Sequence, residues 1–113
     1  MKVGRVFYFD AAHYLPDYKG KCERLHGHTY KLEVVVRGDM GADGMLMDFS
    51  ELKEVVNSGI LELLDHSNLN DLFENPTVET IASWILNELK KKTPVYSVKL
   101  WEGHGKWVEV CSD

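Results

Sequence analysis

The sequence predicts one α+β domain spanning residues 1–113, with a four-stranded antiparallel sheet and two helices on one face of that sheet. Three observations predict this class. Apolar residues alternate along the first third of the chain, recur with helical spacing through its middle, and alternate again around a glycine pair near its end. The elements therefore follow in the order ββααββ, and 113 residues suffice for one hydrophobic core.

Two strands are predicted at the N-terminus, joined by a charged loop from Tyr14 to Leu25. The first strand runs from about Val3 to His13, so that His13 ends its apolar face. The second strand runs from about His28 to Gly38, and His26 and His28 lie in register with its apolar face. That face carries Tyr30, Leu32, Val34 and Val36.

Two amphipathic helices are predicted in the middle of the chain. Asp48 begins the first helix, with Glu51 three residues later in a capping-box pattern, and the helix ends near residues 65–68. Gly59 is expected to weaken this helix locally, by about 1 kcal/mol relative to Ala. Thr77 caps the second helix, Glu79 lies in its first turn, and lysines 90–92 end it. The apolar stripe of the first helix comprises Phe49, Leu52, Val56, Ile60, Leu63 and Leu64.

A C-terminal hairpin is predicted from Val95 to Gly103 and from Lys106 to Cys111. The sheet face opposite the helices is not cleanly polar, and one small chain has nothing left to cover it. We therefore infer that sheets from several subunits join or pack together. The apolar residues on this open face are Val6, Tyr8, Ala12, Val35, Val95, Trp101 and Trp107.

Composition and charge exclude several classes of protein. No apolar run approaches the roughly 20 residues of a membrane helix, and the N-terminus lacks a signal-peptide pattern. The net charge of −5, without a basic block, argues against nucleic acid as a partner. The two cysteines do not favour a disulfide in a reducing cytosol. We therefore expect a cytoplasmic protein.

Three histidines predict a metal site. His26 and His28 are two residues apart on a strand and face the same side, and His13 ends the apolar face of another strand. Three imidazoles that leave a fourth position open for water or substrate suit a catalytic zinc ion. The alternative is that the three are unrelated, partly buried histidines that make ordinary hydrogen bonds.

Four other polar residues, Cys22, Asp65, His66 and Glu102, can each be interpreted as functional or as structural. Cys22, four residues before His26, is an inert thiol, a fourth zinc ligand, or a base or nucleophile beside the metal. The pair Asp65 and His66 is a helix end, or a carboxylate that orients an imidazole for proton transfer. Glu102 lies on a face that should be buried, so it needs either a salt bridge or a polar ligand.

Six segments, taken in order along the chain, resemble the 6-pyruvoyl-tetrahydropterin synthase family. The three residues between Cys22 and His26 are similar to the 6-carboxytetrahydropterin synthase branch, which serves queuosine (7-deazaguanine) biosynthesis. The segments are Phe9-Asp10-Ala11-Ala12-His13, Cys22-x-x-x-His26-Gly27-His28-x-Tyr30, Gly44-Met45-Leu46-Met47-Asp48-Phe49, Leu64-Asp65-His66-x-x-Leu69-Asn70, Asn75-Pro76-Thr77-x-Glu79 and Trp101-Glu102.

The resemblance implies an architecture and an assembly. It implies the tunnelling fold, in which trimers close a barrel from four-stranded sheets and two trimers stack into a homohexamer. This agrees with the apolar face that one subunit leaves uncovered. It also implies active sites at subunit interfaces, so that the residues of one site need not all come from one chain.

The resemblance also implies roles for individual residues. His13, His26 and His28 would hold zinc, and Cys22 would be the base that abstracts a proton. Asp65 and His66 would form a second acid–base element. Glu102 would accept paired N–H bonds from the aminopyrimidine edge of a pterin, helped by Thr77 and Glu79. Val78 stands where a small hydroxyl residue is common in relatives.

The implied reaction converts 7,8-dihydroneopterin triphosphate to 6-carboxy-5,6,7,8-tetrahydropterin with loss of triphosphate and acetaldehyde. The first alternative is 6-pyruvoyl-tetrahydropterin synthase, which eliminates triphosphate only. An alternative of another class is a non-catalytic pterin- or purine-binding protein with structural zinc, in which Cys22 would be a permanent ligand. No glycine-rich phosphate loop is present to show what binds the triphosphate.

Overall fold

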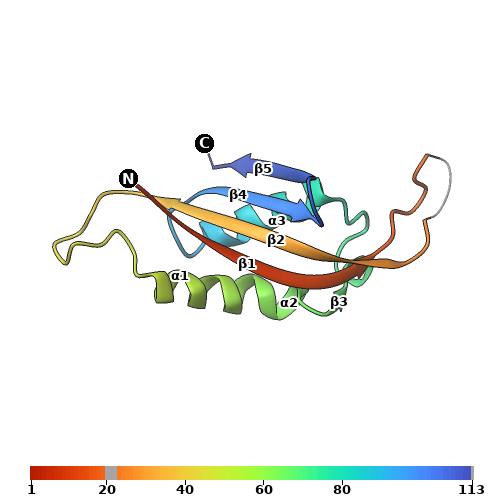
Figure 1. Cartoon of the computed structure of the whole chain (residues 1–113), viewed down its shortest axis with the longest axis horizontal. Helices are drawn as coiled ribbons and strands as arrows, with labels where there is room; N and C mark the ends of the chain where they lie inside the picture. The colour runs from red at the N-terminus through yellow and green to blue at the C-terminus, as the bar shows by residue number, and fades with distance from the viewer. Residues whose placement is uncertain (20–22, 113) are drawn as a thin grey trace.

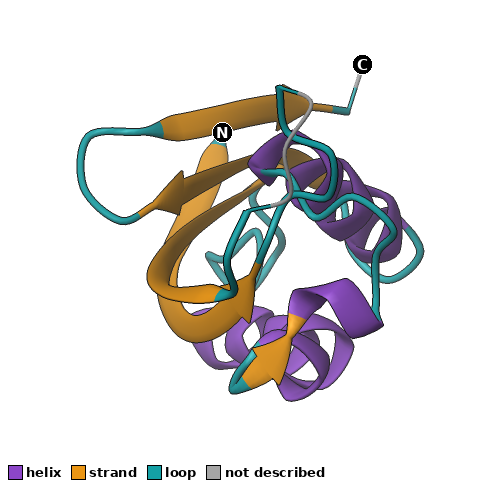
Figure 2. Cartoon of the chain, turned by 90° about the vertical axis from the view of Figure 1, so that its right-hand side faces the viewer, coloured by secondary structure: helices purple, strands orange, loops and turns teal. Residues whose placement is uncertain are grey.

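The computed structural model describes residues 1–19 and 23–112, and it confirms the α+β class with helices on one face of a sheet (Figures 1 and 2). The molecule is elongated, with extents of 55 × 25 × 25 Å. Its elements are β1 (Lys2–His13), β2 (His26–Arg37), α1 (Phe49–Val56), the π-helical turn η1 (Asn57–Leu61), α2 (Glu62–Leu64), β3 (Ser67–Asn68), the 3₁₀ turn η2 (Leu69–Asp71), α3 (Val78–Lys90), β4 (Val95–Glu102) and β5 (Trp107–Cys111).

The sheet has five strands in the order β3-β1-β2-β4-β5, so the prediction of four antiparallel strands was wrong in this detail. The additional strand, β3, pairs in parallel with β1 through Ala11–Ser67 and Ala12–Asn68. The other neighbouring strands are antiparallel, as predicted. A strand of two residues is too short to show an alternating pattern, so β3 could not be predicted from the pattern of apolar residues.

The first predicted helix is interrupted. Asp48 caps α1 by accepting a hydrogen bond from the Ser50 amide at 2.7 Å, but the α-helix ends at Val56 and a π-helical turn around Gly59 precedes α2. Glycine lowers the helical stability at that point, and a π turn accommodates one extra residue. The second helix agrees with prediction, because the Thr77 side chain caps α3 and accepts from the Thr80 amide at 3.1 Å.

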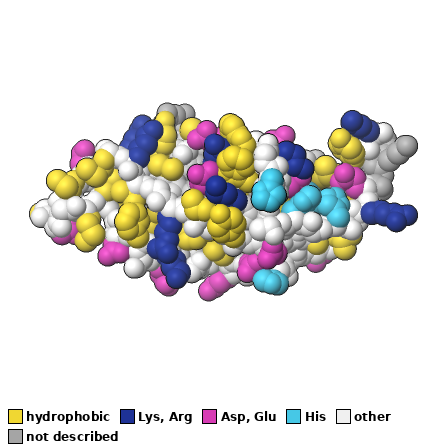
Figure 3. All heavy atoms as spheres, in the orientation of Figure 1, with side chains coloured by type: hydrophobic (Ala, Val, Ile, Leu, Met, Phe, Trp, Pro, Cys, Tyr) yellow, Lys and Arg dark blue, Asp and Glu magenta, His cyan; other side chains and the backbone are white. Residues whose placement is uncertain are grey.

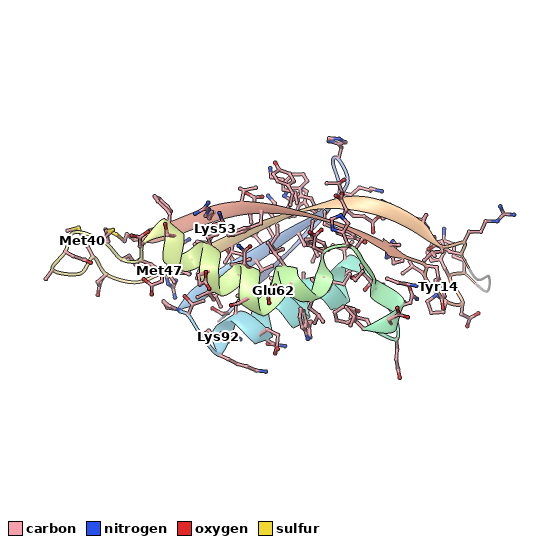
Figure 4. All side chains as sticks on the ribbon, turned by 90° about the horizontal axis from the view of Figure 1, so that it is seen from below. Tyr14, Met40, Met47, Lys53, Glu62 and Lys92 are labelled. Atoms are coloured by element: carbon pink, nitrogen blue, oxygen red, sulfur yellow. The ribbon has the colours of Figure 1, made fainter. Side chains whose placement is uncertain are left out.

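One hydrophobic core lies between the helices and the sheet (Figure 4). The predicted apolar face of β2 is fully buried, as are Leu52, Val56, Ile60 and Leu64 of the first helical segment. Phe49 and Leu63 do not join them, being 60% and 46% exposed. Leu63 follows the π turn, which changes the direction in which the residues after Val56 point. Phe49 is exposed at the other end of this segment, as the first residue of α1.

The open face of the sheet keeps part of its predicted apolar character (Figure 3). Val6, Tyr8 and Trp107 are exposed there, and Lys99 lies over the Trp107 ring at 4.0 Å. Val95 was wrongly assigned to this face: a register shift between Val35 and Val36 places it in the core, 5% exposed. Among the described residues, the helices are all too short or too polar to cross a membrane.

Two adjacent leucines provide a test of this packing. Leu64→Ala should destabilise the protein by about 2–5 kcal/mol, because it leaves a cavity in the core. Leu63→Ala is the matched control and should change the free energy of unfolding by less than about 0.5 kcal/mol. Urea denaturation followed by circular dichroism measures both, and equal losses would contradict the interrupted helix.

Candidate metal centre and adjoining cavity

The register of β1 and β2 brings the three predicted histidines together. His13 lies directly opposite His26, and His28 lies opposite Ala11, with all three side chains on the helix-facing side of the sheet. One potential ligand atom from each histidine lies within 4.8 Å of the other two. The rings meet edge to face, with centroids 4.8–5.1 Å apart.

Backbone carbonyls hold two of these rings in position. Nδ1 of His13 lies 2.9 Å from the carbonyl oxygen of Pro76, and Nδ1 of His26 lies 2.7 Å from that of Arg24. A carbonyl can only accept, so each Nδ1 carries the hydrogen and donates it. In the neutral form of each ring the lone pair is then on Nε2, the arrangement that metal-binding histidines commonly have.

His28 completes the set. In the described part of the chain, its Nε2 is buried and has no hydrogen-bond partner. Burial lowers the pKa of His28 below its ordinary value, although the nearby Glu102 carboxylate opposes this shift. A neutral imidazole with a buried, unpaired nitrogen is the form that binds a metal ion.

Glu102 lies beside the histidines at the end of β4. Its carboxylate oxygens are 3.6 Å from Nε2 of His13 and 3.7 Å from Nε2 of His28, and 3.5 Å from Nζ of Lys106. The turn from β4 to β5 returns Lys106 to this position, with Gly103 and Gly105 at positive φ. The predicted polar environment of Glu102 is therefore present, and Lys106 supplies a salt bridge.

A cavity of about 560 Å³ opens beside this centre. It contains three of the predicted site residues, Thr77, Glu79 and Glu102, together with His13. Its other charged residues are Asp17, Lys19 and Lys106. Three carboxylates and two lysines favour a ligand that presents hydrogen-bond donors to the cavity.

Asp65 and His66 form a second cluster, with Asp10, at the edge of β1. Oδ1 of Asp65 accepts from the Asp10 amide at 3.0 Å and lies 3.0 Å from Nδ1 of His66. The Asp10 hydrogen bond, and then the contact with His66, lower the pKa of Asp65. His66 has a φ of 59°, a conformation that costs energy outside glycine. The structure therefore pairs these two residues as predicted, but as a cluster of their own.

The family model for 6-pyruvoyl tetrahydropterin synthase matches residues 2–112 of this chain. The chain belongs to this family. A dihydroneopterin monophosphate aldolase from Pyrococcus furiosus is 44% identical over 94% of the chain and 96% of its own length. A 6-carboxy-5,6,7,8-tetrahydropterin synthase from Haemophilus influenzae is 37% identical over 89% of the chain and 92% of its own length.

A solved structure confirms the fold. The 6-pyruvoyl tetrahydropterin synthase of Caenorhabditis elegans superposes with a TM-score of 0.87, is 27% identical, and covers 100% of this chain and 96% of its own. The tunnelling fold expected from the resemblance is thus shown for this chain. The predicted base Cys22 lies outside the described residues.

Sequence reasoning missed three contributions to the site of this family member. Pro76 supplies the carbonyl that orients His13, and Lys106 supplies the cation beside Glu102. Tyr30 was assigned to the core and received no role in the site, yet its hydroxyl is buried near Glu102, and burial and that carboxylate both raise the pKa of Tyr30. The sequence did carry signals: Lys106 is a cation next to a hairpin turn, and Tyr30 ends one of the six resembling segments.

Metal binding tests the centre directly. His13→Ala, His26→Ala and His28→Ala should each weaken Zn²⁺ binding by more than roughly 100-fold, since losing even a group that only hydrogen-bonds to a metal ligand costs about 10–100-fold in affinity. His104→Ala is the control, because His104 is exposed at the hairpin tip. Competition with a chromogenic chelator measures the affinities, and retention of Zn²⁺ by all three variants would exclude this centre.

Proposed function

We propose that the chain is a zinc-dependent lyase that converts 7,8-dihydroneopterin triphosphate to 6-carboxy-5,6,7,8-tetrahydropterin, releasing triphosphate and acetaldehyde and consuming one water, in queuosine (7-deazaguanine) biosynthesis. The observation that carries the proposal is the convergence of three imidazoles, one of which, His13, lines a cavity that Glu102 also lines. The Haemophilus influenzae relative, named for this product, supports the branch. We expect the reaction to take place in the cytoplasm.

The donor set fits zinc, with His13, His26 and His28 as ligands through Nε2. When bound there, zinc would supply a Lewis acid for the side-chain hydroxyls of the substrate. Glu102 would accept two N–H bonds from the aminopyrimidine edge of the pterin. Thr77 and Glu79 line the same cavity and would contact the ring from the start of α3.

Proton transfer is assigned to two elements. Cys22 would act as the base that removes the proton from the carbon next to the hydroxyl, since a nearby cation lowers the pKa of a thiol. Asp65 and His66 would form the second acid–base element, with the carboxylate orienting the ring at 3.0 Å. Their cluster lies at the edge of β1, and we expect it to serve a site in a neighbouring copy.

We propose a homohexamer built from two trimers. Within residues 1–19 and 23–112, no strand pairs with the outer edge of β5, and β3 pairs with β1 only at Ala11 and Ala12, so we expect β5 of one copy to pair with β1 of the next. Repeated around an axis, this pairing closes a ring and encloses the open face with Val6, Tyr8 and Trp107. Light scattering tests the assembly, and a monomer at working concentration would refute it.

Two other reactions have specific support. The Pyrococcus furiosus relative is named as an aldolase acting on dihydroneopterin monophosphate, at 44% identity over nearly the whole chain. On this chain, that reaction would break the bond between the first two side-chain carbons and release a phosphorylated aldehyde. The Caenorhabditis elegans structure supports the pyruvoyl synthase, which releases triphosphate and no aldehyde.

Product analysis separates these reactions. The zinc-loaded protein should convert 7,8-dihydroneopterin triphosphate to a product with the mass of carboxytetrahydropterin, together with acetaldehyde. Mass spectrometry measures the pterin, and a coupled dehydrogenase assay measures the aldehyde. Cys22→Ala should lower the rate by at least about 100-fold while zinc content and fold stay intact, as expected for a lost general base.

Each alternative has its own outcome in the same assay. Pyruvoyltetrahydropterin without aldehyde would assign the pyruvoyl synthase, and turnover of dihydroneopterin monophosphate to a hydroxymethyl pterin would assign the aldolase. A folded, zinc-bound oligomer without turnover of either substrate would indicate a binding protein. In that case Cys22→Ala would be expected to lose zinc.

A further inference from the structure

The hydroxyl of Tyr30 is a polar group that the proposed reaction does not yet use. Tyr30 is fully buried, and within the described residues its hydroxyl oxygen has no hydrogen-bond partner. A buried hydroxyl without a partner costs stability, so such groups are rare and usually serve a purpose. Replacing Tyr30 with Phe would preserve the packing and remove this cost.

The position of the Tyr30 ring is fixed by its neighbours. It stacks on Phe9 with centroids 4.9 Å apart and an angle of 7° between the planes. The rings of His13 and His28 meet it edge to face, at 6.3 and 5.9 Å. The hydroxyl therefore stays close to the metal centre and cannot turn away toward solvent.

Glu102 is the natural partner of this hydroxyl. Tyr30 and Glu102 are directly opposed on β2 and β4 and project from the same face of the sheet. Nδ1 of His13 donates its hydrogen to the Pro76 carbonyl. In the neutral ring Nε2 then carries a lone pair and no hydrogen, so it cannot donate a hydrogen bond to the Glu102 carboxylate. Among the contacts described above, the Lys106 ammonium at 3.5 Å is then the donor to the Glu102 carboxylate.

We propose that Tyr30 is a positioning residue, whose hydroxyl donates a hydrogen bond to Glu102 when a pterin is bound and so aims the carboxylate at the 2-amino and ring N–H groups of the ligand. In this proposal the Glu102 side chain, opposite Tyr30 across the strands, rotates away from the two Nε2 atoms and toward the hydroxyl when the pterin binds. The inference rests on the proposed function, because it takes a pterin as the ligand. It assigns Tyr30 a part in selecting an aminopyrimidine ring.

The role predicts opposite effects on stability and on binding. Tyr30→Phe removes the buried hydroxyl, so the melting temperature should equal or exceed that of the wild type. The same variant should bind pterin about tenfold more weakly, the effect of one lost hydrogen bond. If Tyr30 only packed the core, Tyr30→Phe would lower the melting temperature and the pterin affinity together, or would change neither.

The test compares two ring ligands on the zinc-loaded protein. Titration calorimetry measures unsubstituted pterin and lumazine, which has an oxygen in place of the 2-amino group. Tyr30→Phe should weaken pterin binding about tenfold and lumazine binding by less, because lumazine keeps a ring N–H but lacks the 2-amino group, so that the preference for pterin falls. Tyr96→Phe is the matched control, since it removes a hydroxyl from β4 where the ring lies under Lys2 and Arg37, at 4.1 and 4.4 Å.

The outcomes separate the inference from the function on which it rests. Unchanged pterin affinity in Tyr30→Phe, or an equal loss for both ligands, would overturn the role of Tyr30 and leave the lyase proposal standing. A large fall in melting temperature would show a packing role and would also overturn it. If the wild type bound no pterin, both the inference and the proposed function would fail.

Discussion

The antiparallel register of β1 and β2 is the constraint on which the site depends. It runs along the whole of β1, from Lys2 opposite Arg37 to His13 opposite His26. A slip of one residue would turn His26 and His28 to the open face and expose Tyr30, Leu32, Val34 and Val36. The burial of that apolar face therefore fixes the register, and the register fixes the geometry of the metal ligands.

The electrostatics of the centre follow from its position at the end of this buried face. Backbone carbonyls hold Nδ1 of His13 and of His26, and burial favours the neutral form of His28, while Glu102 contributes a carboxylate that is only partly shielded from water. A metal cation would balance this combination, because it would bind the Nε2 lone pairs and attract the carboxylate. In the proposed function the same carboxylate would also accept from the N–H groups of a pterin.

The remaining polar cluster, of Asp10, Asp65 and His66, lies apart from the three histidines. His66 has an unfavourable backbone conformation, and its amide donates to the Asp10 carbonyl at 2.7 Å as the chain enters β3. This strained turn holds Asp65 and His66 at a sheet edge that has room for another strand. The proposed ring of subunits would use that edge both to complete the sheet and to bring the acid–base pair to a neighbouring site.

The sequence by itself determined the class of fold, the long strands, both helix caps and the common face of the three histidines. These features depend on side-chain period and on capping residues, which act between residues close in the chain. Only the tertiary structure decided which distant residues are in contact. It brings Pro76 to His13 and Asp10 to Asp65, places Lys106 and Tyr30 around Glu102, and pairs β3 with β1. It also moved Val95 into the core through a bulge and turned Leu63 to solvent after a π turn. Most of these contacts join residues far apart in sequence, where a local pattern carries no information on register or distance.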